Sequence, residues 1–125
     1  MSVEARIAEL TQKMLRRKLY AVLSHPSPSP EKLKALLPSH LEYMISLEKR
    51  GVLFASGPLA DGDGPPNGAG LTILRAANAR KARELAEADP FVRNELRTFE
   101  LKEWTIMEGT LGLRVNLFDQ SVEVA

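Results

Sequence analysis

The chain of 125 residues is 44% hydrophobic and 26% charged, a balance typical of one globular domain. Its 17 basic residues face 16 acidic ones, so no net field attracts a nucleic-acid backbone or an anionic membrane surface. The absence of cysteine excludes disulfides, thiolate nucleophiles and cysteine-based zinc sites.

The N-terminal segment predicts an amphipathic helix over residues 3–16. Its apolar residues Val3, Ile7, Leu10 and Met14 recur at spacings of three and four, with charged residues between them. Those charges also exclude the uninterrupted apolar run of a signal peptide, and no later stretch is long enough to span a membrane. We therefore expect a cytoplasmic protein.

A short apolar run over residues 18–24 predicts the first strand, which ends where three prolines follow. A second helix begins after them, with Ser29 as N-cap and Pro30 as first helical residue, and it ends at Gly51. Pro38 lies inside this helix, so we expect a kink or a break there. The inward face of the helix comprises Leu33, Leu36, Leu37, Leu41, Met44, Ile45 and Leu47.

The rest of the chain alternates strand, turn and helix signals. In chain order it predicts a strand over 52–59, a long mobile loop over 60–69, a strand over 70–75, a helix over 79–88 capped by Asn78, a strand over 98–107, a short strand over 111–117 and a tail over 119–125.

The predicted order after the first helix is βαββαβ, which indicates an α+β, ferredoxin-like fold: an antiparallel sheet of four strands with two helices on one face. Apolar side chains point to both sides of these strands, so the second face of the sheet also needs cover. Two copies packed sheet to sheet would supply it, and we expect a homodimer.

His40 is the candidate for acid–base chemistry. It follows Leu33 by seven residues and precedes Met44 by four, so helical spacing places it on the inward, apolar face. Burial disfavours the charged imidazolium while a nearby carboxylate favours it, and this balance suits a proton acceptor at neutral pH. A core histidine bonded to a carbonyl or to water is the alternative.

Asp89 follows a helix and precedes Pro90, which is the arrangement of an N-cap before a new helical turn. The cap alone explains the residue. A carboxylate can also orient an imidazole through its Nδ1–H, and both roles need the same residue type.

Three segments together resemble the YciI-like family: PSHLEYMISLEKRG on the second helix, FASGPL on the strand after it, and AEADPFV after the third helix. The resemblance covers residues 18–108. It implies a dimeric α+β barrel with a catalytic His/Asp pair, here His40 and Asp89, in a pocket shared between subunits. On this basis we divide the chain into an N-terminal helix (1–17), a YciI-like domain (18–108) and a C-terminal strand and tail (109–125).

Other candidates are weaker. Ser56, Gly57 and Pro58 end a strand and are expected either to form a turn or to bind substrate, since a glycine lets a ligand approach the backbone. His25 beside the prolines is expected to be an exposed loop residue. The acidic residues of loop 60–69 lack the spacing of a calcium site, so we expect no metal there.

Two functions remain open. The first is a cofactor-free enzyme of lyase or isomerase type that uses His40 as general base and Asp89 as its orienting partner, on a small, aromatic-derived metabolite. The second is a non-catalytic protein that binds a small molecule in the same dimer pocket. No nucleotide-binding loop and no nucleophile elbow is present in the sequence, so we expect no cofactor.

Overall fold

The structure is a computed structural model of the chain and describes residues 1–124; Ala125, the last residue of the predicted tail, lies outside the described residues. The chain divides into two compact units. Lys18–Thr105 form the larger unit, and the two ends of the chain, Met1–Arg17 and the residues from Ile106 onward, form the smaller one.

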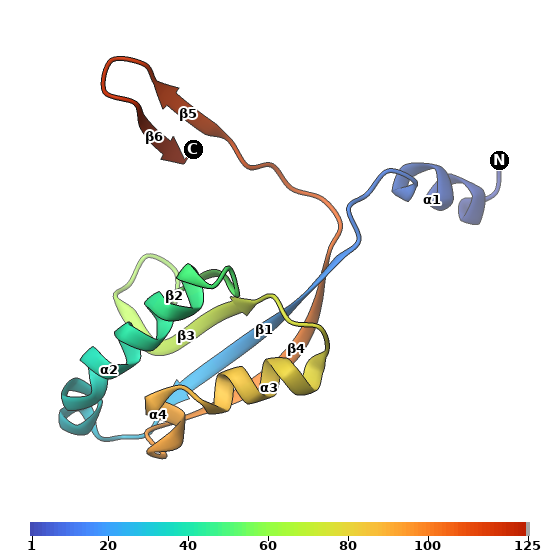
Figure 1. The fold of residues 1–125 in the computed structure, drawn as a ribbon. Coiled ribbons are helices and arrows are strands. Elements are labelled where there is room, and N and C mark those ends of the chain that lie inside the picture. Colours follow the sequence, from blue (N-terminus) through green and yellow to red (C-terminus); the bar gives the residue numbers. More distant parts are fainter. Residues whose placement is uncertain (125) are drawn as a thin grey trace. The chain divides into compact units, whose positions relative to one another are not determined.

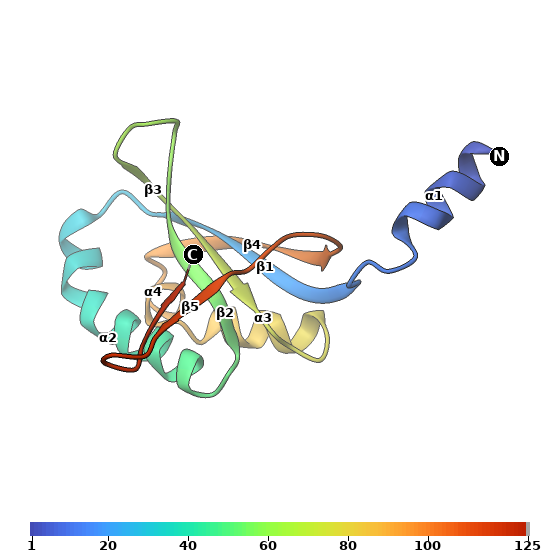
Figure 2. The same cartoon turned by 90° about the horizontal axis from the view of Figure 1, so that it is seen from above.

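The larger unit has the predicted βαββαβ order (Figure 1). Its four strands form one sheet in the order β2-β3-β1-β4, and β3 pairs antiparallel with both β1 and β2. Figure 2 shows α2 and α3 on the same side of this sheet. The elements are β1 (Arg17–Pro26), α2 (Pro30–Lys49), β2 (Leu53–Ala60), β3 (Pro66–Leu74), α3 (Ala79–Glu87), α4 (Pro90–Arg93) and β4 (Arg97–Ile106).

The core lies between the helices and the sheet. Val22 of β1, Leu47 of α2, Leu74 of β3 and Ala86 of α3 form a buried cluster, and partly buried residues of α2, β2 and β4 pack around it. Ala82, on the same face of α3 as Ala86, has no exposed surface, because small side chains let the helix approach the sheet closely. The predicted helix-covered face of the sheet is therefore confirmed.

Leu47 is the best test of this core. Its side chain is 1% exposed, so Leu47→Ala would leave a cavity between α2 and the sheet. We expect the free energy of unfolding to fall by about 2–5 kcal/mol. Urea denaturation at a fixed protein concentration measures this change. The matched control is Ile45→Ala, at a position of α2 that is 50% exposed, which should lower the free energy of unfolding much less. Equal losses of stability in the two variants would contradict the assigned core.

The structure corrects the predicted end of the first helix. α1 spans Val3–Thr11, not 3–16, and none of its residues is buried. Arg16 adopts a φ of 53°, and its guanidinium donates to the carbonyl oxygens of Thr11 and Met14. These bonds satisfy the carbonyl oxygen of the last helical residue and one in the segment that follows it.

The second helix is not divided at Pro38. α2 runs without interruption through this residue, and Pro38 is exposed. The proline lacks the N–H that would bond to the carbonyl one turn earlier, but an exposed carbonyl can accept from water instead. Of the predicted kink or break, the break is therefore wrong. The predicted start is confirmed, since Ser29 is the N-cap and Pro30 the first residue, although the Ser29 side chain makes no capping bond.

The hairpin and the C-terminal segment are more ordered than predicted. β3 begins at Pro66, where Ala60 pairs with it, so only 61–65 form the loop that was expected over 60–69. The expected tail forms a strand as well: β6 (Ser121–Val124) pairs antiparallel with β5 (Leu113–Asn116), in the smaller unit. The two strands have the alternation of apolar and polar residues that is typical of a hairpin.

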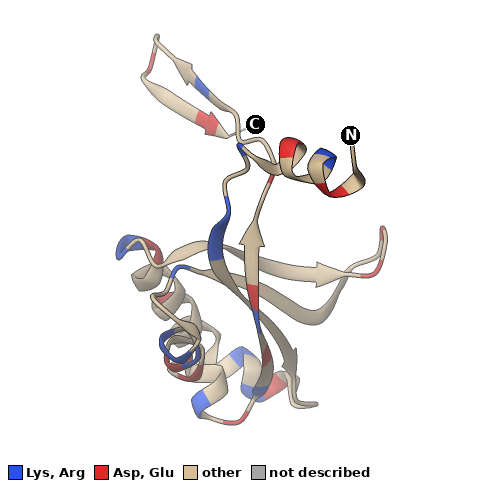
Figure 3. Cartoon of the chain, turned by 90° about the vertical axis from the view of Figure 1, so that its right-hand side faces the viewer, with Lys and Arg blue, Asp and Glu red and all other residues tan. Residues whose placement is uncertain are grey.

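Figure 3 shows basic and acidic residues close together along the helices. Within residues 1–124, none of the helices has both the length and the apolar character that a membrane crossing requires.

Candidate functional site

A cavity of about 450 Å³ lies in the larger unit, between the helices and the sheet. Leucine, methionine and phenylalanine side chains form much of its wall, and His40, Asp89 and Arg97 are the lining residues that carry or can carry charge. Its lining polar and aromatic residues include Ser24, His40, Tyr43, Ser56, Thr72, Asp89, Phe91, Arg97 and Phe99.

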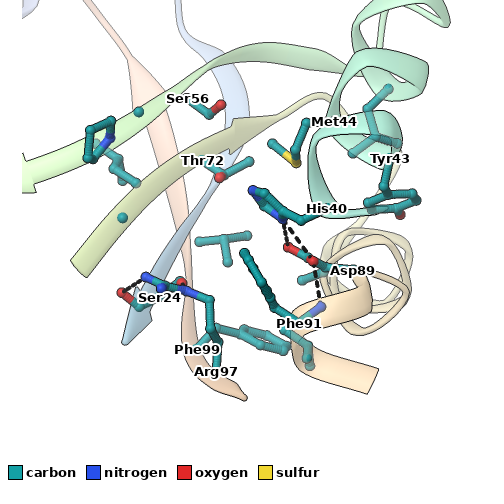
Figure 4. Close-up of a pocket in the computed structure, with 18 of the residues that line it drawn as sticks. Ser24, His40, Tyr43, Met44, Ser56, Thr72, Asp89, Phe91, Arg97 and Phe99 are labelled. Atoms are coloured by element: carbon teal, nitrogen blue, oxygen red, sulfur yellow. Dashed lines mark hydrogen bonds and ion pairs between the residues drawn. The ribbon is translucent and has the colours of Figure 1, made fainter. Parts of the chain in front are cut away.

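The His40 imidazole is bonded to Asp89 inside this cavity (Figure 4). Nδ1 of His40 lies 2.9 Å from each carboxylate oxygen of Asp89. The two side chains are 22% and 16% exposed, so water screens the pair only in part. The sequence prediction that helical spacing turns His40 inward agrees with this position, because α2 places it above the sheet.

Asp89 has two partners. As the N-cap of α4, its Oδ1 accepts a hydrogen bond from the backbone N–H of Phe91 at 2.9 Å, and the same oxygen faces His40. An ionised carboxylate only accepts hydrogen bonds, so Nδ1 of His40 carries a proton. In the neutral ring Nε2 is then unprotonated and can act as a base.

Phe91 fixes the plane of the imidazole. Its ring stacks on that of His40 with centroids 4.5 Å apart and planes inclined by 22°. Figure 4 shows the second ring nitrogen of His40 pointing away from Asp89 and into the cavity. Asp89 thus orients the imidazole through one ring nitrogen and Phe91 through one ring face. The other ring nitrogen is left open to a molecule in the cavity.

Tyr43 lines the same cavity but its hydroxyl is committed elsewhere. The hydroxyl donates to the carbonyl oxygen of Leu85 at 2.7 Å. Burial raises the pKa of Tyr43; the Arg50 charge lowers this pKa and the Asp89 charge raises it further. The phenol thus stays protonated at neutral pH and serves to tie α2 to α3.

Arg97 brings a positive charge to the sheet side of the cavity. Its guanidinium donates to the hydroxyl and carbonyl oxygens of Ser24 and to the carbonyl oxygen of Gly68, and its Cζ lies 5.9 Å from the Phe91 ring centroid. Burial lowers the pKa of Arg97, and the Asp89 charge partly offsets this effect. An arginine nevertheless keeps its charge at neutral pH.

The predicted binding residues Ser56, Gly57 and Pro58 all line the cavity, and their roles stay predictions. Ser56 pairs with Thr72 across the β2–β3 ladder, so these two side chains share the face that looks toward the helices. His25 is exposed, as expected, and is absent from the lining, but it lies within β1 and not in a loop.

Sequence reasoning missed Arg97 and the stacking role of Phe91. The available signal was alternation: Arg97 precedes Phe99 and Leu101 by two and four residues, so it shares their inward face. The strand was expected to begin at residue 98, one position too late for Arg97 to be included. No group of three His, Asp or Glu side chains within residues 1–124 could hold a metal ion.

A βαββαβ domain with a four-stranded antiparallel sheet, covered on one face by helices over a cavity, has the ferredoxin-like architecture that proteins of the dimeric α+β barrel superfamily share. The chain belongs to the family of the YCII-related domain, whose model matches residues 18–105. The family resemblance drawn from the sequence is thereby confirmed.

One solved structure with a similar fold is the 5-chloro-2-hydroxyhydroquinone dehydrochlorinase TftG from Burkholderia phenoliruptrix AC1100, in complex with 2,5-dihydroxybenzoquinone. The TM-score is 0.58 and the sequence identity 21%, over 69% of this chain and 92% of that one. At this identity the likeness shows a common fold. The search of curated proteins found no match.

Proposed function

We propose that the chain is a cofactor-free enzyme of lyase or isomerase type, with His40 as the general base and Asp89 as the residue that orients it. The single observation that carries this proposal is the His40–Asp89 hydrogen bond at 2.9 Å, which leaves Nε2 of His40 directed into the cavity. A histidine placed only for packing would not need its free nitrogen on the cavity side.

The proposed chemistry is a proton transfer. Nε2 takes a proton from a C–H or O–H group of the substrate, and the Asp89 carboxylate stabilises the imidazolium that forms. In an isomerase the proton returns to another carbon of the same molecule. In a lyase the electron pair of the broken C–H bond forms a double bond, the leaving group departs with its own bonding pair, and His40 returns the proton to solvent or to that group.

The cavity supports a small ring compound as substrate. Its volume of about 450 Å³ lies within the range usual for small-molecule sites, roughly 300–1,000 Å³. Phe91 and Phe99 offer aromatic surface, and Ser56 and Thr72 offer hydroxyl groups on the sheet side. TftG was solved with a small aromatic-derived quinone, which favours the same class of ligand for this chain.

We further propose that Ser56, Gly57 and Pro58 contact the substrate. Gly57 lines the cavity beside Ser56, and a glycine lets a ligand approach the backbone closely. Ser56 can donate from its hydroxyl to a ring oxygen.

A ligand screen tests the proposed function. Thermal-shift measurements with small phenols, lactones and hydroxyquinones identify the compounds that bind, and each of these is then incubated with the protein and followed by absorbance and NMR. Conversion of a bound compound without added cofactor or metal supports the enzyme. Saturable stabilisation with no conversion of any bound compound would instead support a binding protein.

We also propose a homodimer. Val22 faces the helices, so its neighbours on β1 face the opposite side, where Leu23 pairs with Leu71 and Ala21 with Ile73. Ile73 is already buried, and the other three residues are partly exposed. Soluble monomers rarely show large contiguous apolar patches. The smaller unit adds exposed apolar side chains, namely Leu111, Leu113, Val115, Leu117, Phe118, Val122 and Val124.

Sedimentation equilibrium at micromolar concentration should therefore give twice the chain mass of 13.8 kDa. Leu23→Lys places a charge on the proposed interface and should shift the equilibrium toward the monomer, whereas Ala35→Lys at an exposed position of α2 should not. A wild-type mass of one chain would refute the dimer, and with it the proposal that subunits share the pocket.

A further inference from the structure

Arg97 carries a charge that the protein itself does not neutralise. Among the described residues no carboxylate lies within ion-pair distance of its guanidinium, and its three hydrogen bonds go to uncharged oxygens of Ser24 and Gly68. Asp89, the acidic residue of the lining, is already bonded to His40 and to the Phe91 N–H. A half-buried cation without a counter-ion favours an anionic partner.

The geometry of the guanidinium keeps part of it available. Nε and Nη2 make the bonds to Ser24 and Gly68, and no hydrogen bond among residues 1–124 uses Nη1. Gly70 makes room for the group, because a Cβ at this position would lie 3.7 Å from Nη2 and a longer side chain would reach into the same space. Figure 4 shows the guanidinium extending toward Ser24, on the floor of the cavity.

Phe91 connects this charge to the proposed base. His40 stacks on the Phe91 ring, and Arg97 lies within cation–π distance of the same ring. His40 and Arg97 both line the cavity, so a ring bound there has two polar contacts to draw on, Nε2 of His40 and the N–H groups of Arg97. These are the two contacts needed to take a proton from a molecule and to hold a negative oxygen on it.

We propose that Arg97 binds an anionic oxygen of the ligand, so that the cavity selects small ring acids, carboxylates or ionised enols, over their neutral analogues. The inference deepens the proposed function and rests on it for the place of the ligand beside His40. Arginine suits this role because its planar N–H groups match the oxygens of a carboxylate or an enolate.

Matched probes test the selection in binding. The pair 4-hydroxybenzoate and 4-hydroxybenzamide differs in charge with little change of shape, and the pair 2,5-dihydroxybenzoquinone and 2,5-dimethoxybenzoquinone does the same for enol oxygens. Calorimetric or NMR titration of the wild type should show at least one acid bound about tenfold or more tighter than its neutral partner. The pair that shows this preference tells whether carboxylate or enolate is the recognised group.

Arg97→Gln should bring that affinity ratio close to one, because it lowers the affinity for the acid probe and leaves the affinity for the neutral probe nearly unchanged. Arg97→Lys keeps the charge and should restore part of the preference. The matched control is Arg83→Gln: Arg83 lies over the Phe99 ring, at 5.4 Å, but does not line the cavity, and its loss should leave the ratio as in the wild type.

Several outcomes would overturn the inference. One is a wild type that binds acid and neutral probes equally, or that binds no acid probe. Another is an Arg97→Gln variant that keeps the wild-type affinity ratio. A third is an Arg97→Gln variant that loses affinity for both probes alike, which is the effect expected of a purely structural arginine. The readout is binding and does not depend on turnover. If Arg97→Gln changes the affinity ratio but the wild type converts neither probe nor any other ligand, the enzyme proposal fails and the inference about Arg97 stands. Turnover that depends on His40 with an unchanged ratio in Arg97→Gln would defeat the inference alone.

Discussion

His40→Gln is expected to lower turnover of a substrate found in the ligand screen by about 10²- to 10⁴-fold, the loss typical of a missing general acid–base group. Glutamine keeps a donor that can bond to Asp89, but it has no nitrogen that accepts a proton at neutral pH. The side chain it replaces is only 22% exposed and stacks on Phe91, so we expect a modest fall in the melting temperature with the fold retained.

The matched control for this variant is His25→Gln, which removes the second histidine of the chain at an exposed position outside the cavity. It should leave turnover unchanged. If His40→Gln remains folded, binds the substrate as the wild type does and still converts it at the wild-type rate, the proposed base is wrong and His40 is a packing residue.

Asp89→Asn is expected to lower turnover by a similar factor, about 10²- to 10⁴-fold, while leaving α4 intact. Asparagine keeps an oxygen that can accept from the Phe91 N–H, and Asn caps helices as well as Asp does. Its amide NH₂ then faces His40 as a donor, which favours the ring form that has its proton on Nε2. That form presents a donor to the cavity in place of a base.

The ¹⁵N resonances of the imidazole measure this change directly, since they report which ring nitrogen carries the proton. Asp119→Asn is the control, because Asp119 also caps a local turn, with its Oδ1 accepting from the Ser121 N–H, and belongs to the smaller unit. It should alter neither tautomer nor turnover. An unchanged His40 tautomer with full turnover in Asp89→Asn would reduce Asp89 to a helix cap.

The features that sequence could predict are those set by short-range periodicity and capping. Spacing from Leu33 and Met44 turned His40 inward, and the Asp-Pro step identified Asp89 as the cap of α4. What joins them is the packing of α2 against α4, residues that are 49 positions apart. No local rule supplies such a contact, so the pair entered through the family resemblance.

The errors have the same origin. The first helix was expected to continue to residue 16 because its apolar spacing continues, yet it ends at Thr11, and none of its residues is buried against a core that would hold a longer helix. Pro38 was expected to kink or break α2, yet the helix continues through this residue, where the carbonyl left without a partner is exposed to water. Arg97 was overlooked because a charged residue at a strand end is usually solvated, and only the cavity reveals its inward face.

One oxygen of Asp89 links the stability of α4 to the orientation of His40. Oδ1 holds the first turn of α4 and faces the imidazole at the same time, and Phe91, whose N–H it accepts, is also the residue that stacks on that imidazole. A change that destabilises this four-residue helix therefore also makes the imidazole of His40 less well oriented. By thermodynamic reciprocity, a ligand that holds the imidazole in place stabilises the helix. Local folding of α4 and the orientation of the base are thus coupled through one oxygen, and a substitution at position 89 that removes this acceptor altogether should disturb both.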